Sequence, residues 1–500
     1  VTDKDGLRVS RLEPKNFRLL IDGEEVPIEY FTEIRDGKVI PSAIEVPELA
    51  DAESVGTNFL IFIDEFFPLS NDKKRVLAAV AERAMNMRPE DRAAVVAWDG
   101  RKLVMLSDWT SSPAETTAAV EGAMERPSGG LHREMERSQW LYRPTATGVR
   151  VRRRGYYGAR YRLGPQEEQY ASRLVAQLRS AVGAASAALR GMETPPGRKA
   201  MILLSGGWPW DPAQWVAESY RRMISHPLIP RGAELYGPLS DTANLLGYTI
   251  YAVDVPGLQA TGGVDASLRA PRPAGSDFEF FLEQEIHDSL QFLADESGGR
   301  ALINGQRISA FDEVVGDVRS YYWIGFSPDW ARDNERHEIR LEVDHEDLSV
   351  RARQGFPDLS PQSQTALAVQ SSLLFGKAGG SDALQVKLGE AQKGKKGKLN
   401  VPVTISIAAS ELVAVERDGQ WVSEVDLFIA AMDEGGGLAE VPPIPLVFSS
   451  SRRPKANDKF IYNTTLIVRK KTTELAIAVY DRNGDKRLTR VLVKGKETQS

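Results

Sequence analysis

A run of five apolar residues that ends in two carboxylates constrains the fold more than any other feature of the chain. The stretch Phe59–Ile63 has no polar interruption, and Asp64 and Glu65 follow directly. An unbroken apolar strand is what a sheet buried on both faces requires. In open α/β sheets, polar residues just beyond such a strand lie at the carboxyl edge, where ligands bind. We therefore expect any functional edge of this protein to begin at Asp64.

Downstream of this run, apolar strands alternate with helical patterns as far as Arg319. We expect further strands at Ala93–Trp98, Leu103–Leu106, Lys199–Ser205, Thr249–Val253 and Arg300–Ile303. Strands that alternate with helices are typical of a mostly parallel sheet. The pattern therefore predicts an α/β domain over residues 57–319.

The segments on either side of this domain have the short period of strands. The 500 residues of the chain are too many for one hydrophobic core, so we expect several domains. Residues 1–50 and 320–357 each hold too little chain for a core, so we expect them to pair in one small β domain. Residues 358–382, rich in Ser, Gln and Gly, are interpreted as a linker, and the alternating strands of 383–500 predict a β-sandwich.

The composition and the motifs exclude several classes of function. The chain has no Cys, which rules out disulfides, thiolate metal sites and Cys nucleophiles. Its net charge of −6 argues against bulk binding of nucleic acid. No apolar run reaches the roughly 18 residues of a membrane span, so we expect none in this chain. The sequence has no P-loop, nucleotide fingerprint, nucleophile elbow or His-x-x-x-His pair, so we expect no enzyme activity.

A basic, aromatic stretch interrupts the alternating pattern at residues 131–162. It holds nine Arg and two Glu, so it carries about +7 and the rest of the chain about −13. Arg with interspersed aromatic residues is typical of surfaces that bind polyanions. The alternative, which charge complementarity favours, is packing against the acidic remainder of the same chain or of a second copy. The candidate residues of this patch are Arg150, Arg152, Arg153, Arg154, Tyr156, Tyr157 and Arg160.

The order of several motifs resembles that of von Willebrand factor A-type (vWA) proteins. The motifs are the strand that ends at Asp64, the stretch Arg88–Val96, and Gly197-Arg198-Lys199-Ala200 before a buried strand. The chain is also similar to the vWA-related proteins abundant in Acidobacteria, through residues 1–6, 17–23, 248–254, 321–328 and 350–356.

The resemblance covers about residues 1–357 and carries expectations about fold and location. It implies an α/β fold with a doubly wound, mostly parallel sheet and helices on both of its faces. Residues 383–500 match nothing more particular than an immunoglobulin-like sandwich. Members of the family commonly look secreted, so we expect a secreted, periplasmic or cell-surface protein.

A vWA domain typically binds Mg²⁺ at the top of its sheet, and each ligand position can be compared with this sequence. Asp64 stands at the position of the first-strand Asp, but Phe66 and Pro68 stand where that motif has Ser. Gly206 stands where the family has an Asp after the fourth strand, and Ser128-Gly129-Gly130 corresponds to a loop that carries Thr. A hard divalent cation needs oxygen ligands. We therefore expect no metal and no cofactor at this edge.

A displaced cation site is the alternative. It would hold Mg²⁺ or Ca²⁺ with oxygen-bearing side chains near the same edge. Its ligands would be Asp64, Ser70, Asp72 and Asp254. The interpretation that we favour is structural: Asp64 and Asp254 would cap helices or accept hydrogen bonds from loop amides.

Large aromatic residues gather at the same predicted edge. If these side chains are exposed, they form a surface for a protein partner. If the insertions at 131–162 or 256–275 cover them, they are packing residues, and the sequence leaves both alternatives open. The candidate partner-binding residues are Asp64, Glu65, Phe66, Phe67, Trp208 and Trp210.

We expect from these observations a non-enzymatic, extracytoplasmic protein with a degenerate metal site, which binds a protein partner or serves as a scaffold. One alternative is a metal-dependent adhesion module with a rebuilt cation site around Asp64. Another is a structural subunit that assembles with copies of itself.

Overall fold

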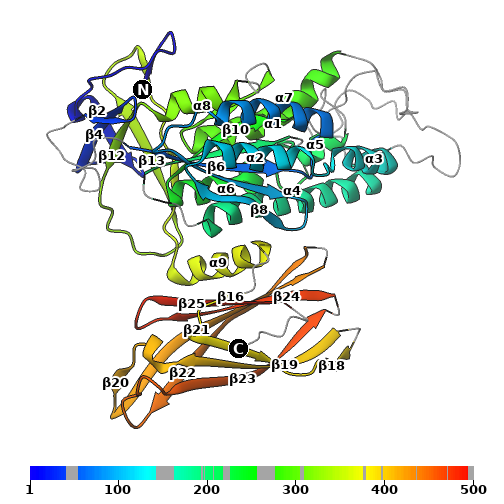
Figure 1. The fold of residues 1–500 in the computed structure, drawn as a ribbon, viewed down its shortest axis with the longest axis vertical. Coiled ribbons are helices and arrows are strands. Elements are labelled where there is room, and N and C mark those ends of the chain that lie inside the picture. Colours follow the sequence, from blue (N-terminus) through cyan, green and yellow to red (C-terminus); the bar gives the residue numbers. More distant parts are fainter. Residues whose placement is uncertain are drawn as a thin grey trace, which may run out of the picture. The chain divides into compact units, whose positions relative to one another are not determined.

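The chain divides into two compact units in the computed structural model. The first unit comprises Val1–Gly100, Val104–Asp329 and Arg336–Pro357, and the second comprises Arg101–Leu103, Trp330–Glu335 and Asp358–Ser500. Figure 1 shows the helices and strands of each unit. The structure describes residues 1–40, 55–141, 163–192, 195, 197–206, 208–217, 226–255, 276–304, 309–375, 379–395, 398–434, 436–469 and 471–493.

A six-stranded sheet lies at the centre of the first unit. Its strands are β6 (Thr57–Asp64), β7 (Arg92–Trp98), β8 (Leu103–Thr110), β9 (Arg198–Ser205), β10 (Tyr248–Asp254) and β11 (Arg300–Leu302), in the order β11-β10-β9-β6-β7-β8. β6 is the apolar run of the sequence, and all of its residues are buried. It pairs in parallel with β7 and with β9, so the carboxyl ends of these three strands lie at one edge.

Helices of this unit pack on the sheet or on one another. They are α1 (Ser70–Ala84), α2 (Pro113–Met124), α3 (Gly130–Leu141), α4 (Pro165–Gly191), α5 (Pro212–Ala217), α6 (Ala233–Leu246), α7 (Ser276–Glu296) and α8 (Ala310–Val318). Phe59, Ile61 and Ile63 of β6 share one core with residues of α1, α2 and α8, and α4 contacts β6 and β7. Gly247 ends α6 at φ +83°, a conformation that favours glycine.

Antiparallel strands from both flanks complete the first unit. They are β1 (Thr2–Asp3), β2 (Phe17–Ile21), β3 (Glu24–Val26), β4 (Tyr30–Arg35), β5 (Lys38–Ile40), β12 (Tyr321–Gly325), β13 (Arg336–Val343), β14 (Leu348–Ser349) and β15 (Gly355–Pro357). β2 pairs with β13, and β4 pairs with β12. Strands from the two ends of the unit are therefore joined by hydrogen bonds.

Two antiparallel sheets share one hydrophobic core in the second unit. Their strands are β16 (Gly379–Gly380), β17 (Leu384–Leu388), β18 (Gln392–Lys393), β19 (Lys398–Ala408), β20 (Val415–Arg417), β21 (Gln420–Asp433), β22 (Leu438–Ser450), β23 (Lys459–Arg469), β24 (Thr472–Asp481) and β25 (Lys486–Val493). One sheet has the order β16-β25-β24-β21-β20, with β22 beside β21, and in the other β17, β18 and β23 all pair with β19.

A helix lies within the segment that the sequence interpretation assigned to a linker. This helix, α9 (Pro361–Phe375), packs on β21 and β24 of the second unit (Figure 1). Its buried residues include Thr365, Val369 and Leu373. The segment is therefore a packed part of the second unit rather than a linker alone.

The predicted fold class is wrong. Of the described residues, about 39% lie in strands and about 32% in helices. Within that part of the chain, five of the six sheets contain only antiparallel pairs, and the sheet around β6 is mixed. The fold is therefore a mixture of helices and mostly antiparallel sheets, rather than a doubly wound, mostly parallel α/β fold. The alternating pattern over residues 57–319 describes one sheet, whereas hairpins in the flanks and in the second unit supply most of the strands.

Asp91 ties the turn before β7 to the start of β6. Its buried carboxylate accepts hydrogen bonds from Thr57 N at 2.9 Å and from Arg88 N at 3.2 Å. The Arg88 guanidinium also donates a hydrogen bond from Nη2 to Asp91 Oδ1 at 3.1 Å. One side chain thus satisfies backbone groups of two segments and holds the two strands at their starts.

Replacing Asp91 by Ala should lower the free energy of unfolding of the first unit by about 2–4 kcal/mol, because the buried Thr57 N–H loses its acceptor. Asp91→Asn should cost less, since its amide oxygen can still accept that bond. Glu90→Ala is the matched control, because the Glu90 carboxylate lies near the surface, 3.3 Å from Arg88, and such pairs contribute less than about 1 kcal/mol. Urea unfolding measures the free energy of unfolding of all three variants. Equal losses of stability in Asp91→Ala and Glu90→Ala would contradict this account.

Candidate functional site

The carboxylate of Asp64, the last residue of β6, is fully engaged by neighbouring donors. Its Oδ1 accepts hydrogen bonds from Phe66 N at 2.8 Å and Phe67 N at 3.3 Å. Its Oδ2 accepts from the hydroxyl of Ser205 at 2.7 Å and from Trp208 Nε1 at 3.0 Å. The side chain is completely buried. Four donors on two oxygens use the acceptor capacity that a carboxylate offers.

Burial and hydrogen bonding act in opposite directions on this group. Burial penalises the charged form and raises the pKa of Asp64 to about 6, while the bonds from Ser205, Phe66, Phe67 and Trp208 work to lower it. The four donors are neutral, so they stabilise the carboxylate without a counter-charge. Asp64 is therefore largely ionised at neutral pH and titrates in the mildly acidic range.

Glu65, the next residue, is neutralised by two cations. Arg126 donates from Nε to both carboxylate oxygens, at 2.8 and 3.0 Å, and Lys73 Nζ lies 3.7 Å from Oε1. Lys73 comes from α1 and is 1% exposed, and its ammonium also donates to the carbonyls of Ala123 and Arg126 at 3.1 and 2.8 Å. Burial raises the pKa of Glu65 and lowers the pKa of Lys73. Positive charge is therefore built into the edge beside Asp64.

The loop before α3 lies directly on the turn that follows β6. Gly129 N donates to Glu65 O at 2.7 Å, and Gly130 N donates to Pro68 O at 3.1 Å. A Cβ at Gly129 would lie 2.4 Å from Phe66 O, so the close approach requires glycine there. The loop Ser128-Gly129-Gly130 is thus packed against the backbone of the turn after β6.

The predicted partner-binding residues come together, but most of them lie inside the protein. Phe66 is half-buried, with the Arg133 guanidinium 4.4 Å from its ring centre and Trp98 at 5.2 Å. Trp208 is fully buried and stacks on Tyr236 with 6.1 Å between ring centroids, and Trp210 lies 6.2 Å from the same ring. Four of these side chains are fully or almost fully buried: Asp64, Glu65, Phe67 and Trp208. In this arrangement these four side chains serve packing and present no surface to a partner.

Three of the four candidate cation ligands, Asp64, Asp72 and Asp254, engage other groups of the protein. Ser70 is exposed at the start of α1, and Asp72 pairs with Arg75 at 2.9 Å. Asp254 ends β10, where its register partner on β9 is Ser205, and its carboxylate lies 3.8 Å from His287 Nε2. Among the described residues, no group of three or more Asp, Glu or His side chains is arranged to hold a metal ion.

A second buried acid lies at the start of α5. Glu285 of α7 is 8% exposed and accepts a hydrogen bond from Asp211 N at 2.7 Å. Burial, together with the nearby carboxylate of Asp211, raises the pKa of Glu285 to about 7. Asp211 itself accepts from Ala213 N and Gln214 N, each at 3.0 Å, so it caps α5. These acids hold backbone in place.

The polyanion or self-contact patch lies outside the described residues. Its candidate residues all fall between 142 and 162, which the structure does not describe. The start of the insertion is helical, because α3 covers Gly130–Leu141. In the part of the chain that is described, no helix is long and apolar enough to cross a membrane.

Sequence reasoning missed the residues that engage the two carboxylates. The sequence pattern indicates only a strand end at Ser205 and an aromatic side chain at Trp208, whereas in the structure both donate to Asp64. Lys73 carries a signal that could have been noticed. It lies three residues before Val76 and four before Leu77, on the buried side of α1, where a charged residue needs a buried partner.

Comparisons with known proteins do not establish a family. No family model matches the chain, and no curated protein matches it. Among solved structures, the pilus adhesin SpaC from Lactobacillus rhamnosus GG has a TM-score of 0.27 at 8% identity, over 94% of this chain and 57% of its own. The SpRpn10 VWA domain has a TM-score of 0.16 at 9% identity, over 40% of this chain and 89% of its own.

The TFIIH p34 N-terminal domain has a TM-score of 0.19 at 12% identity, over 52% of this chain and 97% of its own. These are weak structural likenesses to a vWA domain and to an adhesin. At such low scores they carry no argument about what this protein does.

The variant Asp64→Asn tests whether this carboxylate is buried, because burial makes the free energy of unfolding depend on pH. The pKa of Asp64 is raised from 3.8 to about 6 on folding, so the stability linked to its proton is complete below about pH 4 and lost above about pH 6. Because Asn does not titrate, the wild type should lose about 3 kcal/mol relative to the variant as the pH rises through this range. Urea unfolding of both proteins between about pH 3.5 and 7 measures the difference.

Ser205→Ala sharpens the same test. It removes a donor that favours the ionised carboxylate, so the pH range over which stability is lost should move upward. If the difference in free energy of unfolding between the wild type and Asp64→Asn stays constant with pH, the burial of an ionisable Asp64 is contradicted.

Proposed function

We propose that the chain is a non-enzymatic, extracytoplasmic protein that binds a protein partner or serves as a scaffold, and that it does so without a divalent cation. The observation that carries this proposal is the arrangement around Asp64, whose two oxygens accept four hydrogen bonds from within the chain. A metal ligand must direct a lone pair at the ion. Here the lone pairs are directed at Phe66, Phe67, Ser205 and Trp208.

The charges beside Asp64 support the same proposal. Lys73 Nζ lies 3.7 Å from the Glu65 carboxylate, and Arg126 Nε lies 2.8 Å from it. Two like unit charges about 4 Å apart repel by about 4 kcal/mol at an effective dielectric constant of about 20. A divalent ion that used Glu65 as a ligand would meet both cations. Internal cations thus take the electrostatic place that a bound ion would have.

We further propose that the protein is a divergent relative of vWA proteins in which the metal-dependent contact has been lost. Its support is the order of the motifs around Asp64, Arg88–Val96 and Gly197–Ala200, together with the hydroxyl-free residues Phe66 and Pro68. The extracytoplasmic location follows from the same resemblance, and the absence of Cys is compatible with it.

The non-enzymatic part of the proposal rests on how the buried polar groups at this edge are used. Asp64 binds loop amides, Glu65 pairs with Arg126, and Asp211 caps α5. Groups committed to structural bonds are poor candidates for proton transfer, which needs a group within reach of a substrate.

Calorimetric titration with MgCl₂, MnCl₂ and CaCl₂ tests the proposal against the metal-dependent alternative. The wild type should show no saturable heat at millimolar concentrations of any of the three ions, because no lone pair of Asp64 is available. Asp64→Ala and the surface control Glu82→Ala, which changes an exposed carboxylate of α1 outside the candidate ligand set, should behave in the same way. A saturable signal in the wild type that disappears in Asp64→Ala alone would establish a rebuilt cation site and overturn the proposal.

Partner capture provides the second test. A partner retained by the purified chain from an extract of its source organism should be recovered in equal amounts with EDTA and with MgCl₂. Recovery that requires MgCl₂ and is lost in Asp64→Ala would favour the adhesion module. Loss of recovery after substitution of exposed residues, with no effect of EDTA, is the outcome that we expect.

A further inference from the structure

We propose that the open edge of β23 is a docking site for an extended segment of a partner protein, with apolar residues at alternate positions and acidic residues at both ends. The proposal concerns the second unit and does not depend on the state of Asp64. It rests on an unpaired strand edge, on a hollow beside that edge and on the distribution of charge along it.

β23 has one paired side and one open side. Within the described residues it pairs only with β19, over eleven register positions from Lys459↔Ala408 to Arg469↔Lys398. In an antiparallel pair, alternate residues turn their N–H and C=O groups away from the partner strand. The middle of β23 contains no Pro, so these groups form a continuous row that an added strand can pair with.

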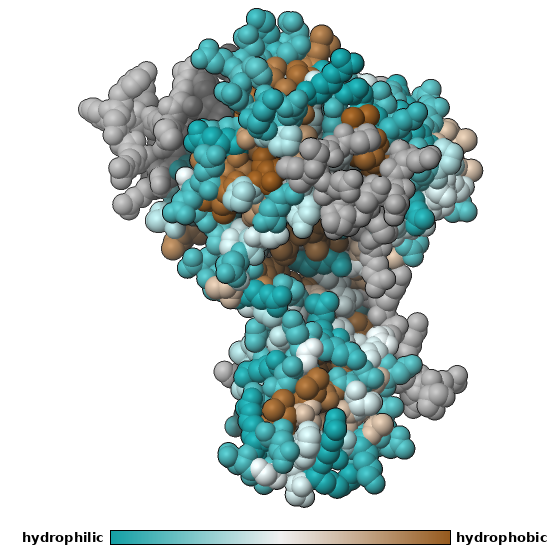
Figure 2. Space-filling view, turned by 90° about the vertical axis from the view of Figure 1, so that its left-hand side faces the viewer, coloured by the Kyte–Doolittle hydropathy of each residue, from teal (hydrophilic) through white to brown (hydrophobic). Residues whose placement is uncertain are grey.

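Exposed apolar side chains gather on β22 and β23. β22 is an edge strand of one sheet of the sandwich, and β23 is an edge strand of the other. Of the thirteen large apolar side chains that are exposed in the described part of the chain, five lie on these two strands. Ile461 and Ile467 are 59% and 67% exposed, and both point away from the core of the sandwich. Figure 2 shows apolar surface within this unit, bordered by hydrophilic residues. Cross-strand neighbours on an added strand would cover such side chains.

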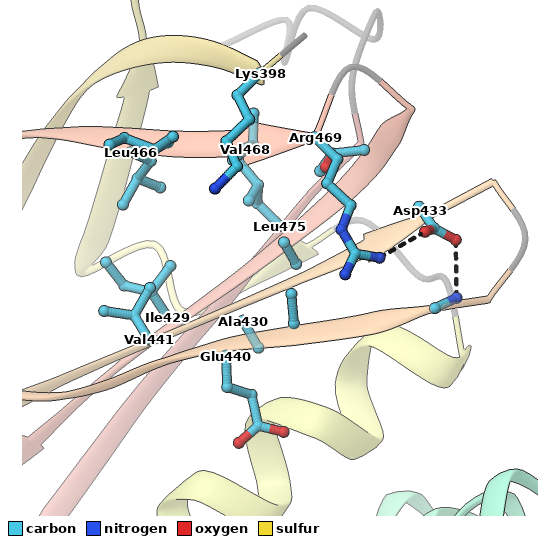
Figure 3. Close-up of a pocket in the computed structure, with 15 residues that line it drawn as sticks. Lys398, Ile429, Ala430, Asp433, Glu440, Val441, Leu466, Val468, Arg469 and Leu475 are labelled. Carbon is cyan, nitrogen blue, oxygen red and sulfur yellow. Dashed lines mark hydrogen bonds and ion pairs between the residues drawn. The ribbon is translucent and has the colours of Figure 1, made fainter. Parts of the chain in front are cut away.

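A hollow of about 250 Å³ opens between the two sheets beside this edge. Figure 3 shows Leu466 and Val468 of β23 above it, with Ile429 of β21 and Val441 of β22 opposite them. The ion pair between Arg469 and Asp433, at 3.4 Å, closes one end. Side chains on the inward face of an added strand would enter this hollow, while those on the outward face would lie beside Ile461 and Ile467.

The neighbouring edge of β22 is unsuited to the same role. Pro442, Pro443 and Pro445 lie within this strand. Proline has no N–H and cannot donate to an added strand, so this edge is protected against pairing. The contrast between the two adjacent edges singles out β23.

Positive charge at both ends of β23 specifies the chemistry of the partner. Residues 451–471 hold seven Lys or Arg and one Asp, and three of these cations, Arg452, Arg469 and Lys471, pair with acids of the same unit. Lys459, at the start of β23, donates to the neutral amide of Gln385, and Lys398 lies opposite Arg469 at the other end. A complementary segment therefore carries acidic residues where its ends meet Lys459 and Lys398.

The same charges disfavour a second copy of this chain as the occupant. An antiparallel pair of two β23 strands centred on Thr464 would place Lys459 of each copy opposite Arg469 of the other. Like charges directly opposite each other destabilise a strand pair. A partner of opposite charge meets no such repulsion.

Synthetic peptides of 11 residues, the length of β23, test this proposal on the full chain. One peptide alternates Val and Thr in its centre and carries Asp and Glu at both ends, and a second replaces those acids by Lys. Fluorescence anisotropy should show at least about tenfold tighter binding of the acidic peptide, since a few exposed ion pairs supply roughly that factor. Hydrogen exchange should show new protection confined to the amides of β23.

The variant Lys459→Glu/Lys398→Glu should reverse the preference between the two peptides. Lys387→Glu is the matched control, because Lys387 is an exposed residue of β17, which pairs with β19 on the side opposite β23. Circular dichroism checks that each variant is folded, and exchange in the wild type tests the proposal independently of any variant.

Three results would overturn the proposal. Equal binding of an acidic peptide with a Gly and Ser centre would show simple charge attraction instead of strand addition. Protection of β23 that rises with protein concentration in the absence of peptide would make a second copy the occupant. No change in exchange along β23 at millimolar acidic peptide would show that the edge does not accept a strand.

Discussion

The burial of one carboxylate, that of Asp64, is the constraint on which the edge of the central sheet depends. An ionised group without water must be compensated, and uncompensated burial would cost several kcal/mol. Four neutral donors provide the compensation, and they come from the turn after β6, from the end of β9 and from Trp208. The carboxylate therefore holds three segments of the chain at one point. The same bonds that make it structural leave no oxygen directed at a ligand.

Two adjacent carboxylates at this edge are stabilised in different ways. Asp64 is surrounded by neutral donors, and Glu65 is paired with Arg126 and Lys73. The first arrangement fixes geometry, and the second places positive charge where a cation would otherwise be attracted. The backbone of Phe66 contributes to the first arrangement, and the side chains of Arg126 and Lys73 provide the second. The site is electrostatically complete within the chain.

The sequence was informative where a residue's role follows from its own neighbours. The buried strand that ends at Asp64 could be predicted from an unbroken apolar run, and the turn that Asp91 holds lies within the recognised stretch Arg88–Val96. Roles that depend on distant segments could not be predicted. Lys73 and Arg126 are 53 residues apart in the sequence, yet both contact the carboxylate of Glu65. Hydrophobic spacing gives no information about such a meeting.

Composition misled the interpretation at two places. Ser and Gln in residues 358–382 suggested a linker, but Thr365, Val369 and Leu373 place one side of α9 on the sandwich. Alternation of strands and helices over 57–319 suggested a doubly wound, mostly parallel sheet, whereas the sheet around β6 is mixed and the other described sheets are antiparallel. In both cases a pattern along the sequence did not determine how the segment packs.

The most direct test of the central claim is anomalous diffraction near the manganese absorption edge, from crystals of the full chain soaked in MnCl₂. Mn²⁺ prefers oxygen ligands and would report any cation site at this edge. The account predicts no anomalous peak at coordination distance from the Asp64 carboxylate, with the bonds from Ser205 and Trp208 intact. A peak there with octahedral density, and with either donor displaced, would contradict it.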